Sequence, residues 1–135
     1  MHRDLCAHHR RQNDRLAALA AAQAAARRFD QSADAWILLA EAYVGAYRHK
    51  EALAAYESAL AIEERADIAM TAGELSLREG DAIKAGARFA QAYAAGAGPK
   101  ALRANAEALE TAGDVAAARQ ARLLWEKETG RTWGG

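Results

Sequence analysis

The amino-acid sequence predicts an all-α fold, in which helix hairpins stack one after another into a solenoid. Alanine, the strongest helix former, supplies 39 of the 135 residues. The residues that favour strands are few, with two valines, four isoleucines and four threonines. The chain also repeats itself with a period of 33 residues, which is typical of helical solenoids. These observations argue against a β-sandwich, a β-barrel or a parallel α/β sheet.

Size and composition restrict the remaining classes. A length of 135 residues fits one domain, and the single cysteine excludes an internal disulfide framework. No stretch approaches the roughly 18 apolar residues of a membrane span. The first 15 residues contain no apolar run of the kind found in secretory signals. We therefore expect a cytoplasmic protein, and the abundance of alanine and arginine is typical of a GC-rich bacterial genome.

The zero net charge hides an asymmetry along the chain. Residues 1–28 carry six arginines and two aspartates, whereas residues 29–135 carry 12 basic and 16 acidic groups. We expect residues 1–12 to form a basic, partly disordered arm. Such an arm suits nucleic acid or an acidic surface, but no aromatic residue is interleaved for base stacking, so a solvated terminus is favoured. The arginines concerned are Arg3, Arg10, Arg11, Arg15, Arg27 and Arg28.

The internal repeat defines the order of the elements. Because an alanine-rich chain matches itself by chance, the matches between other residues carry the argument. They are Glu41 with Glu74 and Glu107, Tyr56 with Phe89, and Gly80-Asp81 with Gly113-Asp114.

Each element follows from helical spacing and from helix-ending residues. An alanine-rich helix over 13–29 comes first, as an N-terminal cap. Apolar residues at intervals of three and four then predict three hairpins. In the second and third hairpins, glycine ends the first helix and aspartate caps the next. Two glycines and Pro99 end the fifth helix. The expected helix pairs are 33–46 with 49–63, 66–79 with 82–95, and 99–112 with 115–128.

The residues of the first hairpin carry a family pattern. They read Trp36-x2-Leu39-Ala40-x2-Tyr43, followed by Ala52-x3-Tyr56 and Ala59. This pattern resembles the tetratricopeptide repeat. The second repeat keeps Gly73, Ala85 and Phe89, and the third keeps Leu102, Ala106, Leu109 and Ala118. The departures are Ala69 and Ser76 in the second repeat and Asn105 and Arg122 in the third.

The resemblance implies a right-handed superhelical solenoid of antiparallel hairpins, with about seven helices. We expect a single domain over 13–130, with repeats at 33–65, 66–98 and 99–130 and a tail at 131–135. Small residues of the first helices would sit against small residues of the second helices, because two helices approach closely only where side chains are small. The pairs are Ala40, Gly73 and Ala106 against Ala52, Ala85 and Ala118.

The resemblance also implies a concave groove, lined by the first helix of each hairpin, that binds a partner. A clamp for the C-terminal carboxylate of chaperones is doubtful, because apolar and acidic residues replace the family's Lys, Asn and Arg. Glu41, Glu74 and Glu107 instead predict a partner segment with Lys or Arg and apolar anchors. The alternative is that these glutamates are helix-favouring surface residues. The predicted groove residues are Ile37, Glu41, Val44, Met70, Glu74, Leu77, Arg78, Arg103, Glu107 and Glu110.

The last predicted helix places a large residue at a small position. Trp125 stands where earlier repeats have Ala59 and Ala92. With Leu123, Leu124 and Trp133 it predicts an apolar end. Either this end is an oligomer or partner interface, for example of a homodimer, or the tail 131–135 folds back and Trp133 covers it.

The remaining chemistry is sparse. No catalytic motif is present, and no cofactor is expected. His2, Cys6, His8 and His9 lack the paired spacing of zinc sites. The sequence therefore predicts a non-catalytic protein- or peptide-binding module, such as an adaptor, assembly factor or small chaperone. The alternatives are a scaffold that assembles through its C-terminal helix and nucleic-acid binding through the basic arm.

Overall fold

A computed structural model describes the backbone of residues 2–134 and the side chains of residues 11–134. Throughout these residues the chain forms seven α-helices and no strand, which confirms the predicted all-α fold. The helices are α1 (His2–Arg28), α2 (Ala33–Gly45), α3 (His49–Ile62), α4 (Ala66–Arg78), α5 (Ala82–Ala94), α6 (Pro99–Ala112) and α7 (Val115–Thr129).

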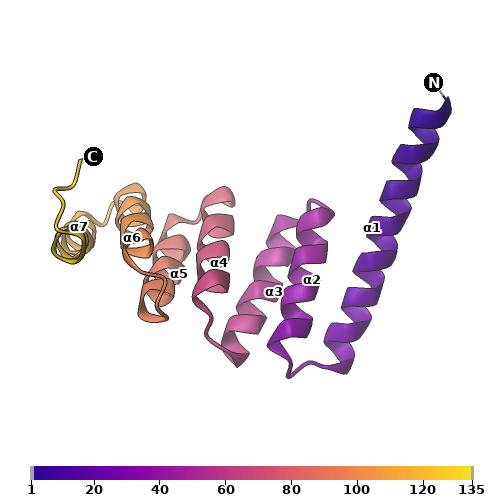
Figure 1. Ribbon diagram of the computed structural model, residues 1–135, viewed down its shortest axis with the longest axis horizontal. Helices are drawn as coiled ribbons and strands as arrows, with labels where there is room; N and C mark the ends of the chain where they lie inside the picture. Colours follow the sequence, from indigo (N-terminus) through magenta and orange to yellow (C-terminus); the bar gives the residue numbers. More distant parts are fainter. Residues whose placement is uncertain (1, 135) are drawn as a thin grey trace. The chain divides into compact units, whose positions relative to one another are not determined.

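The helices form two compact units, which we describe separately. The first unit ends at Glu63 and contains α1, α2 and α3, and the second begins at Glu64 and contains α4 to α7. In the first unit α2 packs against both α1 and α3. In the second unit each helix packs against the next one along the chain, so α5 joins two successive hairpins (Figure 1).

Helix α1 begins at His2 rather than near Asn13, so the backbone of the expected arm is helical from residue 2. No glycine or proline interrupts its 27 residues, and alanine dominates its second half. Leu19, Ala22 and Ala26 are buried and recur at intervals of three and four, which makes them the face of α1 that packs on α2.

The turns inside the hairpins follow the predicted Gly-Asp pattern in the second unit. Gly80 and Gly113 adopt left-handed φ values of 79° and 86°, a conformation that glycine reaches without steric cost. Asp81 then accepts a hydrogen bond from the Lys84 backbone N–H at 3.0 Å. Asp114 caps α7 in the same way. Each short turn thus ends one helix and caps the next.

The first hairpin makes the same turn with less suitable residues. Tyr47, which aligns with Gly80, adopts a φ of 60° and is the one non-glycine residue with positive φ among those described. A side chain in this region costs roughly 1–2 kcal/mol. Arg48 aligns with Asp81 and gives no side-chain cap to α3.

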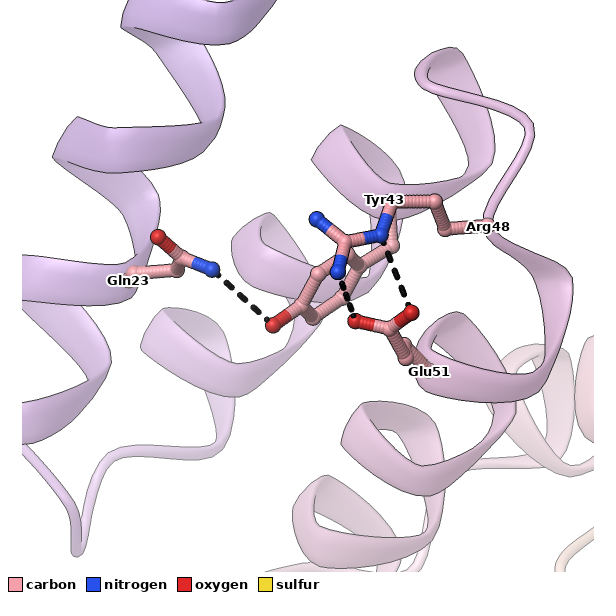
Figure 2. A network of polar contacts seen from close by, with 4 residues as sticks. All are labelled: Gln23, Tyr43, Arg48 and Glu51. Atoms are coloured by element: carbon pink, nitrogen blue, oxygen red, sulfur yellow. Dashed lines mark hydrogen bonds and ion pairs between the residues drawn. The ribbon is translucent and has the colours of Figure 1, made fainter.

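Polar contacts around Tyr43 join α1 to the first hairpin (Figure 2). The Gln23 amide on α1 donates to the Tyr43 hydroxyl at 3.2 Å. The Arg48 guanidinium lies 5.3 Å from the centre of the Tyr43 ring and pairs with Glu51 at 2.7 Å. Arg48, although not a cap, therefore holds the Tyr43 ring against the turn through a cation–π contact.

Small residues occupy the closest approaches between helices, as the repeat predicts. Ala40, Ala52, Ala85, Ala106 and Ala118 are all 0% exposed. Gly73 meets the tightest limit, because a Cβ atom added there would lie 2.6 Å from the Phe89 ring. Phe89 itself is only 1% exposed. Its ring therefore packs directly on the backbone of α4.

Gly73→Ala provides a test of this close approach. Alanine favours a helix over glycine by about 1 kcal/mol, but the extra methyl must displace a buried ring, at a cost of about 1–3 kcal/mol. We expect urea denaturation to show a net loss of up to about 2 kcal/mol in the free energy of unfolding. Gly45→Ala is the matched control, because nothing lies within 4 Å of its added Cβ. An equal effect of both substitutions would contradict this packing.

Candidate functional site

In the first unit, the predicted groove residues lie on α2 with unequal exposure. Ile37 is 9% exposed and belongs to the core, whereas Glu41 is exposed and Val44 is half-buried. Val44 and Glu41 are therefore the predicted residues of α2 that remain accessible. Ile37 contributes to packing instead.

Glu41 acts electrostatically on the neighbouring helix. Burial raises the pKa of the Tyr56 hydroxyl on α3 above its usual value, and the negative charge of Glu41 raises it further. Both causes disfavour the phenolate. The Glu41 carboxylate is exposed to solvent and still raises the pKa of the buried Tyr56 on α3.

In the second unit, α4 presents an acidic and apolar strip. Met70 is partly buried and packs against a core cluster of Ala85, Phe89 and Ala108. One turn further along, Glu74 is exposed, and Leu77 is 41% exposed although it is apolar. Arg78 is exposed at the end of the helix. The predicted residues of α4 therefore share an accessible strip that is anchored by the Met70 thioether.

Helix α6 differs because its predicted residues are engaged within the unit. The Glu107 carboxylate pairs with the Arg103 guanidinium at 3.3 Å. The Glu110 carboxylate pairs with Arg122 on α7. Among the described residues, Glu41 and Glu74 form no ion pair. The three aligned glutamates are therefore not equivalent, since Glu107 already has a cationic partner.

The C-terminal tail folds back onto α7. The chain reverses at Gly130, whose φ is 69°. The Trp133 backbone N–H donates to the Glu126 carboxylate at 2.8 Å, and the Trp133 ring meets the Trp125 ring edge-on at 5.2 Å and 84°. Trp125 is only 8% exposed. Of the two predicted alternatives for this end, the structure shows the fold-back.

Arg103 links this tail to α6, a contact that sequence reasoning missed. Its guanidinium lies 4.8 Å from the centre of the Trp133 ring and 5.5 Å from that of Trp125. The four residues of the predicted apolar end therefore do not form one patch. Trp125 and Trp133 face Arg103, whereas Leu124 lines a separate hollow and Leu123 is exposed. No spacing in the sequence signals a contact between Arg103 and a residue of the tail.

The hollow beside Leu124 was also not predicted. It has a volume of about 480 Å³ and lies between α5, α6 and α7. Its walls are mainly small or apolar residues, and the buried Asn105 contributes a polar group. The Asn105 amide donates to the Gly86 carbonyl at 2.7 Å, which joins α6 to α5. Asn105, which departs from the family pattern, is thus satisfied by the backbone of the preceding hairpin.

The other candidate residues lie on α1. The side chains of His2, Cys6, His8 and His9 lie outside the described residues, as do those of Arg3 and Arg10. The side chains that are described include no cluster of three potential metal ligands. Arg11, Arg15, Arg27 and Arg28 are exposed on α1, where Arg15 lies over the Tyr47 ring and Arg28 over the Phe29 ring. Within the described chain, no helix has the length and apolar character needed to cross a membrane.

The elevated pKa of Tyr56 gives a measurable consequence. Because the folded state disfavours the phenolate, the contribution of Tyr56 to stability should be fully present below its unfolded pKa of about 10 and be lost as the pH rises through its folded pKa. Glu41→Gln should lower the folded pKa of Tyr56 while burial keeps it above the usual value. NMR of the tyrosine Cζ carbons measures this pKa.

The control is Glu74→Gln, which removes a charge in the other unit and should leave the Tyr56 titration unchanged. An unaltered Tyr56 titration in Glu41→Gln would show that Glu41 does not act on this ring.

Comparison with known proteins supports the same architecture. No family model and no curated protein matches the sequence. Among solved structures, the MamA protein matches at a TM-score of 0.71 and 19% identity, over 86% of this chain and 64% of that one. A thermophilic TPR protein of Thermus thermophilus matches at 0.56 and 22% identity, over 84% of this chain and 64% of that one. The chain thus spans less than two thirds of the length of either protein. The resemblance predicted from its repeats is confirmed, because its fold is that of a tetratricopeptide-repeat-like protein.

Proposed function

We propose that this chain is a non-catalytic protein-binding module, acting as an adaptor, assembly factor or small chaperone. The fold supports this role, because a helix hairpin of such a stack presents the exposed residues of its first helix to a partner. The proposal assigns the binding to exposed residues of α2 and α4. It requires no cofactor.

The observation that carries this proposal is that two exposed carboxylates lack an ion-pair partner among the described residues. Glu41 and Glu74 are exposed and have no ion-pair partner among the described residues. Each lies on a helix with accessible apolar groups, namely Val44 on α2 and Met70 and Leu77 on α4. Lys or Arg of a partner would meet the carboxylates, and apolar anchors would meet the neighbouring side chains. Met70 suits such a surface, because its thioether adapts to different shapes.

The residues of α6 have a smaller part in this proposal. Binding a partner cation at Glu107 or Glu110 requires the existing pair with Arg103 or Arg122 to open. The gain from a new exposed ion pair is about 0–1 kcal/mol, which is no more than the pair that is lost. Recognition of Lys or Arg therefore falls mainly to Glu41 and Glu74, with Arg78 and Ile37 contributing little to it.

Charge reversal at the two unpaired carboxylates tests the proposal. We expect Glu41→Lys/Glu74→Lys to weaken partner binding by about tenfold or more, because two attractions of up to about 1 kcal/mol each become repulsions. A pull-down from source-organism lysate, read by mass spectrometry, identifies partners of the unmodified chain. Titration of the purified partner against each variant then gives the affinity ratio.

A charge-matched control separates local recognition from net charge. Glu63→Lys/Glu64→Lys makes the same change in charge at two exposed residues between α3 and α4. This control should bind as the unmodified chain does, and circular dichroism should show both variants to be helical. Equal binding by the Glu41/Glu74 variant would exclude both carboxylates as contacts for the partner.

A further inference from the structure

At the C-terminal end of the second unit, three residues contact Trp133. They are Arg103, Trp125 and Glu126. Arg103 provides a cation whose position is fixed by Glu107 at 3.3 Å. Trp125, which is 8% exposed, provides a ring that an aromatic group meets edge-on. Glu126 provides a carboxylate that accepts a backbone N–H at 2.8 Å. We call these three residues the aromatic subsite.

Trp133 shows which chemistry the aromatic subsite accepts. Its ring lies 4.8 Å from the Arg103 guanidinium and contacts Trp125, while its own backbone N–H meets Glu126. Cation–π attraction is strongest for tryptophan, and an edge-on contact between rings adds to it. A peptide residue with an aromatic side chain and an accessible N–H satisfies all three groups at once.

The tail that supplies Trp133 is held by few contacts. Trp133 is half-buried, whereas Arg131, Thr132 and Gly134 around it are exposed and have no regular secondary structure. The ring–ring contact, the exposed cation–π contact and the hydrogen bond from the Trp133 N–H to Glu126 together are comparable in free energy to the conformational entropy lost when a few residues become ordered. The bound and released states of the tail are therefore close in free energy, so that a competing segment can displace it.

We propose that the aromatic subsite is a binding site for an aromatic residue of a partner peptide, and that the chain's own Trp133 occupies it as a displaceable competitor. This site uses none of the residues of α2 or α4, and the inference does not depend on binding at Glu41 or Glu74. A partner segment with an aromatic residue would replace Trp133 and release the tail.

The test uses the full chain and a defined probe. The probe is the peptide acetyl-Arg-Thr-Trp-Gly-Gly-amide, added at about 1–10 mM, the range of effective concentration that a short linker provides. The readout is the NMR shift of the Trp125 indole N–H and the Arg103 side-chain N–H. In Trp133→Ala we expect saturable shifts, and in the unmodified chain shifts about two- to fivefold smaller at probe concentrations below saturation, because a tail whose bound and released states are close in free energy competes to that extent.

Three controls decide the result. Thr132→Ala changes an exposed residue of the same tail and should behave as the unmodified chain does. A probe with alanine in place of its tryptophan should produce no saturable shift, and Arg103→Gln added to Trp133→Ala should weaken binding. Circular dichroism checks that the helices persist. Equal shifts in Trp133→Ala and in the unmodified chain, or none in Trp133→Ala, would overturn the proposal.

Discussion

The close approach of helices at small residues is the constraint on which the rest of this structure depends. The Phe89 ring packs on α4 because Gly73 has no side chain, and the buried alanines allow similar approaches in the other hairpins. Such packing fixes the rotation of each helix about its axis. Because Gly73 and Ser76 face the core, Met70, Glu74 and Leu77 lie together along the neighbouring face of α4, where Met70 reaches the Phe89 cluster and the other two are exposed. The accessible strip of α4 is thus a consequence of the core.

Internal pairing then determines which charges remain available. Glu41, Glu74 and Glu107 are equivalent in the repeat, yet only Glu107 has an arginine one turn earlier on the same helix. That arginine also lies beside two tryptophan rings. The same side chain therefore neutralises an aligned glutamate and holds the tail. A cation that binds an unpaired carboxylate would therefore find one on α4, at Glu74, but not at the aligned Glu107 on α6, although the two helices occupy the same register of the repeat.

The number of helices, most of their bounds and the small residues between them could be predicted from the sequence. Helical spacing and the Gly-Asp turns are local properties; the spacing recurs in all three hairpins and the Gly-Asp turn in two of them. Ile37 and Arg103 show where such prediction fails. Burial of Ile37 and the contacts of Arg103 depend on tertiary placement, which register alone does not specify. The extension of α1 to His2 was missed because basic residues near a terminus were interpreted as an arm, although none of them breaks a helix.

At Trp125, the size of the residue depends on which segment of the chain packs over that position of the repeat. Ala92 stands at the same register of α5, is 0% exposed, and lies in a helix against which α6 packs. A helix backbone cannot approach so closely over an indole, whereas a short tail can pass around one. Trp125 is therefore compatible with a covering tail but not with a closely packed helix. Because a tail contributes far fewer contacts than a helix, the position that accommodates the large ring is also the one that is most easily uncovered.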